Sequence, residues 1–149
     1  MSHEERNTLV AILVNLSMAG WMTWRIAAMQ GAGRFDGPDG LAVWARTVLR
    51  VIPVGIVATI AAVILFNIVF AIATRDENPS FVTDERDRLI GIQGMRVTLV
   101  VASAGFLGAL VALALGTGAF AVLNAILASF AAGDLLGSLA KLRLYRRGL

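Results

Sequence analysis

The fold is decided by one long apolar run, VTLVVASAGFLGALVALALGTGAFAVLNAILASFAAG at residues 97–133, which contains no charged side chain and no histidine. As a single helix, its 37 residues would extend roughly 55 Å, whereas the hydrocarbon core of a bilayer is about 30 Å thick. The run must therefore fold back on itself. The turn is expected at Gly116-Thr117-Gly118, because two glycines permit a tight reversal of the backbone. We predict two membrane-spanning helices here, at about residues 94–115 and 119–142, joined as a tight antiparallel hairpin.

Two further apolar runs precede this hairpin, and they predict helices at about residues 8–29 and 48–74. The composition agrees with a membrane protein, since 58% of the 149 residues are hydrophobic and only 15% are charged. A chain of this length has no room for a separate catalytic domain beside four crossings. We therefore predict an all-α integral membrane protein, a single membrane domain over residues 1–149 with four transmembrane helices in an antiparallel bundle.

The distribution of Lys and Arg predicts the orientation of these helices. The predicted parts outside the membrane are an external loop at 30–47, a cytoplasmic loop at 75–93 and a basic C-terminal tail at 141–149. Nine Lys and Arg residues lie on the side that holds both termini, and four lie on the other side, namely Arg25, Arg34, Arg46 and Arg50. Both termini are therefore predicted to be cytoplasmic, in a bacterial inner (cytoplasmic) membrane. Because the basic residues flank apolar runs and form no single patch, the net charge of +3 does not predict nucleic-acid binding.

The segment at 41–50 allows two structures. It is either a short interfacial helix, with Asp39 as its N-cap and a bend near Pro53, or a simple extension of the second membrane helix.

The residues that usually carry catalysis are scarce. The chain has no cysteine and one histidine, His3, which argues against disulfides, thiolate metal sites, catalytic triads and haem ligation. No serine is clustered with a base. We therefore predict no enzymatic activity, no cofactor, and no catalytic or metal-binding residue.

Small residues at four-residue spacing predict close helix packing in the second half of the chain. The two stripes are Ala104, Gly108, Ala112 and Gly116 on the third helix, and Ala125, Ser129, Gly133 and Gly137 on the fourth. They pack either against each other within the chain or against a second copy in a homo-oligomer. Polar contacts between helices are expected from Asn15, Asn67 and Asn124.

Asp134 is the one carboxylate inside an apolar helix, and a carboxylate there needs a partner or a proton. Folding the hairpin about Thr117 brings it near Arg96, so an ion pair that locks the hairpin is one interpretation. The other is a site that couples to protons or cations.

The most concentrated charge lies at residues 75–88, RDENPSFVTDERDR. Thr83 is a suitable N-cap, acids in the first turn favour a helix start, and Asp84 and Arg88 can pair one turn apart. Local helix chemistry therefore explains much of this stretch. A divalent cation held by Asp76, Glu77 and their neighbours is an alternative, although the spacing matches no known metal motif.

The same charges also predict a docking site, for a cytoplasmic protein partner or for the basic tail of the chain itself. Its candidate residues are Asp84, Glu85, Arg86, Asp87 and Arg88. The tail residues Lys141, Arg143, Arg146 and Arg147 are candidates for contacts with anionic membrane lipid, at about 1 kcal/mol per charge.

The stretch Thr-Asp-Glu-Arg-Asp-Arg at 83–88, placed just before the third of four crossings, resembles a family of small bacterial integral membrane proteins of unknown function that share a D-E-R-D motif. Some members of that family are encoded beside small helix-turn-helix regulators, so the resemblance implies a regulatory or signalling role. It implies no active-site residue.

Two functions remain in competition. The first is a non-enzymatic regulatory or interaction protein that uses its charged cytoplasmic loop and basic tail. The alternative is a small transporter or channel that acts as an oligomer, with Asp134 as its coupling carboxylate.

Overall fold

The described part of the chain contains four long helices and no strand. The computed structural model describes residues 3–74 and 84–147, and its helices are α1 (His3–Gly31), α2 (Gly40–Thr74), α3 (Glu85–Ala114) and α4 (Ala119–Arg147). All four are long and apolar enough to cross a membrane. The predicted all-α membrane architecture with four candidate spans is therefore confirmed.

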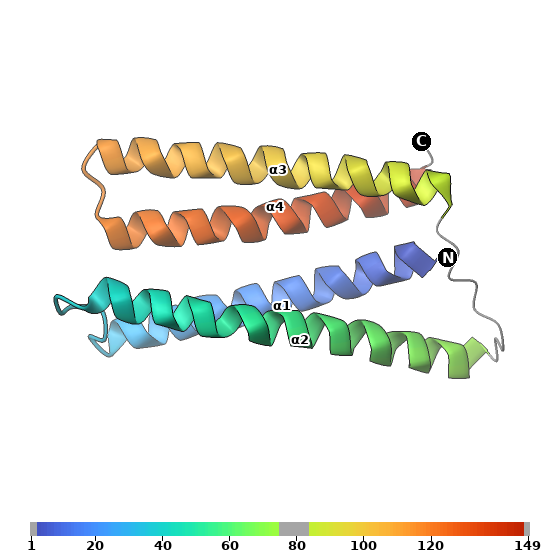
Figure 1. Ribbon diagram of the computed structural model, residues 1–149, viewed down its shortest axis with the longest axis horizontal. Coiled ribbons are helices and arrows are strands. Elements are labelled where there is room, and N and C mark those ends of the chain that lie inside the picture. Colours follow the sequence, from blue (N-terminus) through green and yellow to red (C-terminus); the bar gives the residue numbers. More distant parts are fainter. Residues whose placement is uncertain (1–2, 75–83, 148–149) are drawn as a thin grey trace.

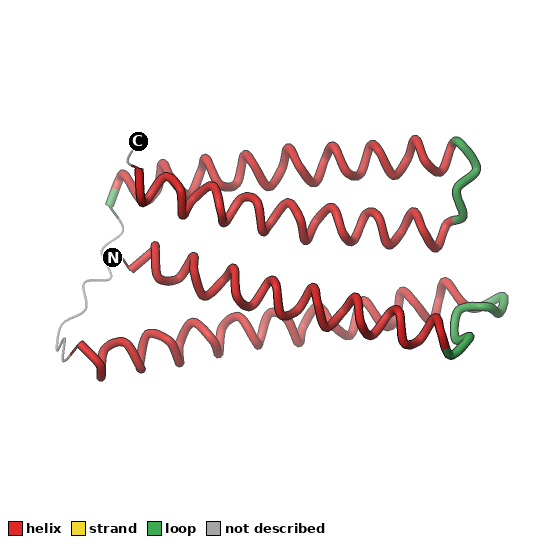
Figure 2. Tube along the Cα trace, turned by 180° about the vertical axis from the view of Figure 1, so that it is seen from behind, coloured by secondary structure: helices red, strands yellow, loops and turns green. Residues whose placement is uncertain are grey.

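The helices run antiparallel along one common direction (Figure 1). The turns between α1 and α2 and between α3 and α4 lie together at one end of the molecule, which we call the turn end. The other end holds the start of α1, the end of α2, the start of α3 and the end of α4 (Figure 2). We call it the charged end, because Glu85, Arg86 and the last basic residues of α4 lie there.

Contacts between the helices follow the spatial order α3, α4, α1, α2. The most extensive interface joins α3 to α4, followed by α1 with α4 and α1 with α2. The tight α3–α4 hairpin is therefore confirmed. Its turn uses Gly116, whose φ of +92° is a left-handed conformation, and Thr117 N–H donates to the Ala112 carbonyl at 3.0 Å to close the end of α3.

Glycines on α4 allow the backbones of α3 and α4 to approach closely. A Cβ atom at Gly133 would lie 2.9 Å from the Thr98 carbonyl oxygen, and one at Gly137 would lie 2.7 Å from the Gly94 carbonyl oxygen. Ser129 also lies in this interface, against Gly105. Three members of the predicted α4 stripe thus pack against α3, whereas Ala125 is exposed.

The predicted stripe on α3 does not form the contact with α4. Ala104 is exposed and Gly108 faces open space, while the interface contains Gly94, Thr98 and Ala102. Because a helix turns by about 100° per residue, position 104 lies roughly 200° around the axis from position 102. Small residues occur on both of these faces. The buried Ile90, with none of its surface exposed, extends the face that α4 covers.

The α1–α2 pair is joined by polar contacts at the charged end. The Arg6 guanidinium lies over the Phe70 ring, 4.0 Å from its centroid, and Asn67 Nδ2 donates to Asn7 Oδ1 at 3.1 Å. The expectation that Asn67 bonds between helices is thereby confirmed.

A hydrophobic cluster joins three helices at the turn end. Trp44 of α2 packs with Met22 and Ile26 of α1, and its indole Nε1 donates to Asn124 Oδ1 of α4 at 3.0 Å. The rings of Phe35 and Phe120 lie against this cluster, 5.0 Å apart between centroids. Asn124 thus also makes its expected contact between helices.

Two helices begin earlier than predicted. The second helix starts at Gly40, with Asp39 before it, and continues through Pro53, so the extension is observed and the loop predicted at 30–47 is shortened to residues 32–39. The third helix starts at Glu85 and passes Gly91 without a break, so residues 85–93 are helical and do not form a loop. Apolar runs mark the membrane core, but a helix continues beyond it until a cap or a turn ends it.

The other two boundaries also lie further out than expected. Helix α1 extends from His3 to Gly31, and α4 continues to Arg147, so most of the predicted basic tail is helical.

Candidate functional site

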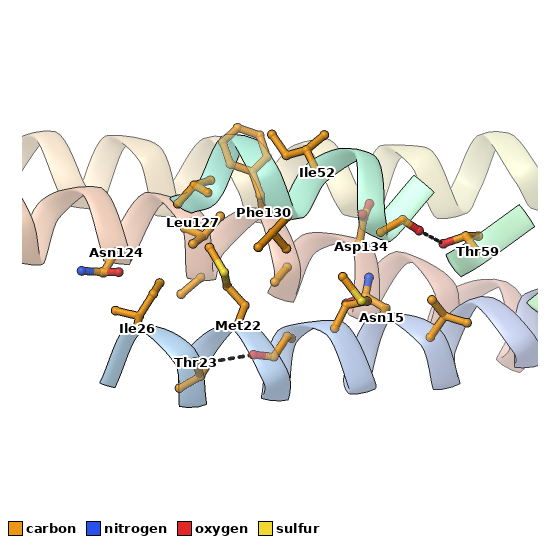
Figure 3. Close-up of a pocket in the computed structure, with 18 of the residues that line it drawn as sticks. Asn15, Met22, Thr23, Ile26, Ile52, Thr59, Asn124, Leu127, Phe130 and Asp134 are labelled. Carbon is orange, nitrogen blue, oxygen red and sulfur yellow. Dashed lines mark hydrogen bonds between the residues drawn. The ribbon is translucent and has the colours of Figure 1, made fainter. Parts of the chain in front are cut away.

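A cavity of about 870 Å³ lies between α1, α2 and α4 (Figure 3). Helix α1 packs against both of its neighbours, and α2 reaches α4 through Trp44 at the turn end. The cavity runs along the three helices from this contact toward the charged end. Small side chains line it on each helix and leave the space open, among them Ala11, Ala19, Gly55, Ala128 and Ala131.

Most of the cavity wall is apolar. Larger side chains contribute to the wall from all three helices, among them Met18, Met22, Ile26, Ile52, Leu127 and Phe130. Figure 3 shows Met22, Ile26, Ile52, Leu127 and Phe130 among the side chains that line this cavity. A wall of this kind suits a ligand whose surface is largely hydrophobic.

A few polar groups lie in the part of the cavity nearest the charged end. They are Asn15 of α1, Thr59 of α2, and Asp134 and Ser138 of α4. The Thr59 hydroxyl donates to the Gly55 carbonyl at 2.9 Å, so its oxygen can still accept a hydrogen bond. Asp134 is the one charged residue among those that line the cavity. It is exposed, so the neighbouring helices do not cover it. The site therefore combines an apolar wall with one carboxylate and several neutral polar groups.

The two residues of the predicted ion pair lie on different faces. Asp134 lines the cavity on the α1 side of α4, whereas Arg96 is exposed on α3 and does not line it. Position 96 lies about 200° around α3 from Gly94, which contacts α4, so Arg96 is carried away from the hairpin interface. Residues 84–147, which contain both side chains, show no ion pair between them.

At the charged end, the first turn of α3 is closed by a capping box. Asp84 is the N-cap, where Thr83 was predicted, and its Oδ1 accepts from Glu85 N–H at 2.6 Å. In return, Asp87 Oδ2 accepts from Asp84 N–H at 3.4 Å. Thr83 itself lies outside the described residues. The Asp84 carboxylate is thus used in the cap, and the described residues show no ion pair between it and Arg88.

The start of α3 also contacts the end of α4. Arg86 Nη2 donates to the Tyr145 carbonyl at 3.3 Å, and the Tyr145 side chain lies near the Asp87 carboxylate. Part of the predicted docking stretch therefore contacts the chain's own C-terminal segment. Glu85 and Arg88 are exposed. Tyr145 was not among the predicted contact residues, although an aromatic residue among basic ones was a usable signal.

The basic residues of the predicted tail differ in their surroundings. The alkyl chain of Lys141 covers Gly94 of α3, which takes it into the hairpin interface. Arg143, Arg146 and Arg147 are exposed around a shallow pocket of about 340 Å³ that Leu139 and Leu142 also line. Exposed guanidinium groups beside apolar side chains suit contact with anionic lipid headgroups.

The described carboxylates at the charged end do not form a cluster. Within residues 3–74 and 84–147, no three acidic or histidine side chains are placed to hold a metal ion. Asp76 and Glu77, which the metal interpretation requires, lie outside these ranges.

Sequence reasoning missed most of the cavity. It singled out Asp134 but connected it with α3, and it expected Asn15 to bond between helices, whereas Asn15 lines the cavity and the described residues show no such bond. The usable signal was that Asn15 is a polar residue within an apolar helix.

Comparisons with protein-family models, with curated proteins and with solved structures found no match to this chain.

Proposed function

We propose that this chain is a non-enzymatic integral membrane protein that binds a small, largely apolar cation in the cavity between α1, α2 and α4. The observation that carries the proposal is the position of Asp134, the one charged residue in the wall of an otherwise mainly apolar cavity of about 870 Å³. No covalent bond is made or broken in this function.

The charge of the Asp134 carboxylate limits which ligands suit this cavity. A charged side chain in a membrane-spanning segment is unfavourable unless a counter-charge, a proton or water accompanies it. Arg96 does not line the cavity, and neither does any other Lys or Arg of the described residues, so these supply no cation there. A ligand with an ammonium or phosphonium group suits both the carboxylate and the apolar wall. Its charge would face Asp134, and its apolar part would cover Met18, Met22 and Phe130.

A transporter would use the same site by exchanging the bound cation for a proton on Asp134. In that form the protein acts as an oligomer, and net movement of substrate across the membrane is the property that distinguishes it from a simple binding protein.

The test is binding of a probe cation, tetraphenylphosphonium, to purified protein in mild detergent. We expect Asp134→Asn to weaken binding by at least about tenfold, which corresponds to 1.4 kcal/mol. Glu85→Gln is the matched control, because it removes an exposed carboxylate far from the cavity. Filling the cavity with Ala131→Phe should also weaken binding.

Equal affinity in Asp134→Asn and Glu85→Gln would refute the role of Asp134. A loss of thermal stability in Asp134→Asn without any change in probe affinity would instead indicate a structural role. Uptake of the same probe into proteoliposomes then separates transport from binding.

A second function is favoured by the charged end. Glu85 and Arg88 remain exposed there although Asp84 and Asp87 are used within the chain, and Arg146 is exposed at the end of α4. We propose that this surface contacts a cytoplasmic protein or anionic lipid in a regulatory role, as the resemblance to the D-E-R-D family implies.

This second function is tested by what co-purifies with the tagged protein. Glu85→Gln/Arg88→Gln removes the exposed charges and leaves the capping box intact, and Asp134→Asn is the control. A stoichiometric partner that is lost only in the first variant supports the proposal. An identical set of co-purifying proteins in both variants contradicts it.

The proposed location is a bacterial inner membrane with both termini in the cytoplasm. Because the chain has no cysteine, single introduced cysteines report orientation directly. Asp36→Cys at the turn end should react with an impermeant maleimide in cells whose outer barrier has been opened, and Glu85→Cys should react only after lysis. The reverse pattern would refute the orientation.

A further inference from the structure

A second, smaller pocket at the turn end has four arginines in its wall. It measures about 370 Å³ and lies between α1 and α2, on residues that the larger cavity does not use. Its lining consists of Arg25, Arg34, Arg46 and Arg50, with Met29, Val43 and Thr47 between them. No acidic side chain lines it.

The local structure explains why these arginines converge. Arg25 and Met29 are one turn apart on α1, and Val43, Arg46 and Arg50 follow one another along one face of α2. Arg34 arrives from the turn. Gly33 adopts φ +65°, and Arg34 N–H then donates to the Met29 carbonyl at 3.0 Å, which folds the residue back toward the end of α1.

No carboxylate of the described residues balances the charge of this pocket. Asp36 and Asp39 belong to the same turn but do not line the pocket. In the described ranges, 3–74 and 84–147, none of the four arginines forms an ion pair with a carboxylate. Arg25 lies beside the Trp21 ring, 5.9 Å from its centroid. Four guanidinium groups that share one small pocket repel each other unless an anion joins them.

The position of these four arginines in the chain is unusual for a membrane protein of the predicted orientation. Between residues 7 and 53, the chain has no Lys or Arg other than these four. In the predicted orientation they lie on the side of the membrane where basic residues are normally few. A role in setting the topology therefore does not explain them, because on that side they act against the predicted orientation.

We propose that this pocket binds the phosphate groups of a phosphorylated ligand. The guanidinium group is planar and donates two parallel hydrogen bonds to a phosphate, so arginine suits this anion better than lysine does. Four arginines match the charge of one ligand with two phosphate groups, or of two ligands with one phosphate group each. Met29 and Val43 provide an apolar surface for the adjoining part of the ligand. The phosphate is supplied either by an anionic phospholipid or by a soluble phosphorylated compound, and this inference does not depend on the function proposed for Asp134.

The test compares phosphate ligands on variants that differ only at this pocket. The background carries Arg143→Gln/Arg146→Gln/Arg147→Gln, so that the exposed arginines of α4 do not contribute to lipid binding. In this background, the protein with the native pocket is compared with Arg46→Gln/Arg50→Gln. Native mass spectrometry measures retention of phosphatidylglycerol against phosphatidylcholine, and calorimetry measures binding of inorganic diphosphate.

We expect the loss of Arg46 and Arg50 to weaken binding by about 10- to 30-fold, and we expect affinity to fall with added salt. Preferential retention of phosphatidylglycerol with no diphosphate binding assigns the site to lipid. Diphosphate binding that displaces the lipid assigns it to a soluble compound. Both results support the proposal.

Equal retention of phosphatidylglycerol by both proteins, together with no diphosphate binding by either, would overturn it. Should Arg46→Gln/Arg50→Gln fail to fold, Arg46→Lys/Arg50→Lys keeps the charge and removes the paired donors. That variant is expected to show a smaller but measurable loss, and unchanged affinity in it would count against the bidentate contact.

Discussion

The substitution Gly137→Ala tests whether close contact between α3 and α4 holds the hairpin together. A methyl group at this position would press against the Thr98 hydroxyl and would lie 2.7 Å from the Gly94 carbonyl oxygen. A backbone oxygen cannot move aside as a flexible side chain can. The two helices must therefore separate by some tenths of an ångström, and contacts are lost along the interface.

The expected magnitude is a balance of two effects. Overpacking at such a contact costs typically 1–3 kcal/mol, about the range measured in protein cores. Replacing glycine by alanine inside a helix contributes about 1 kcal/mol in the opposite direction. The net change in the free energy of unfolding at position 137 is thus a loss of up to about 2 kcal/mol.

Gly108→Ala is the matched control on the facing helix. Nothing lies within 4 Å of a Cβ atom at this position, so only the gain in helix propensity remains. We expect Gly108→Ala to stabilise the protein by about 0.5–1 kcal/mol and therefore to differ from Gly137→Ala by about 1–3 kcal/mol.

The assay is reversible unfolding in mixed detergent and dodecyl sulfate, followed by circular dichroism. Combining Gly137→Ala with Thr98→Ala relieves only the contact with the hydroxyl, so we expect partial rescue. If Gly137→Ala stabilised the protein as much as Gly108→Ala does, the face of α3 that packs on α4 would have to be a different one, and the reasoning would be refuted.

Three further predictions concern single contacts. Trp44→Phe removes the donor to Asn124 Oδ1 and should lower the free energy of unfolding by about 1–2 kcal/mol in the same assay. Asp84→Ala removes the N-cap of α3 and should cost about 1 kcal/mol, with faster amide exchange in the first turn of that helix. Tyr145→Phe keeps the ring but removes the hydroxyl that interacts with the Asp87 carboxylate, so exchange in the same turn should rise with a cost of about 1 kcal/mol or less.

The first two of these predictions have their own controls. Trp24 is 66% exposed, whereas Trp44 is only 8% exposed. Trp24→Phe should therefore leave the free energy of unfolding in detergent unchanged. Arg88→Gln alters an exposed charge in the first turns of α3 without touching the cap. Exchange rates in Asp84→Ala that match those in Arg88→Gln would show that the cap does not stabilise the turn. The prediction for Tyr145→Phe is contradicted if amide exchange in the first turn of α3 equals that of the unmodified protein.

Several features followed from the sequence because they depend on local or average properties. An apolar run longer than a bilayer is thick must fold back, and the Gly116 turn is where it does so. The helix start near residue 84 was also predictable, since capping depends on neighbouring residues, although Asp84 took the place of Thr83. Helix ends outside the membrane were less predictable, because hydropathy shows the membrane core and not the caps.

The arrangement of the helices around their axes was decided by tertiary structure alone. The sequence of α3 offers small residues on two faces, and only the fit against Gly133 and Gly137 selects the face with Thr98 and Ala102. That choice carries Arg96 away from α4 and leaves Asp134 in the wall of the cavity. The sequence by itself determined the number of crossings, their connection at Gly116 and the scarcity of catalytic groups. Packing decided which side chains meet across helices, both at the cavity and at the four arginines. Contacts between residues far apart in the chain depend on how each helix is rotated against its neighbours.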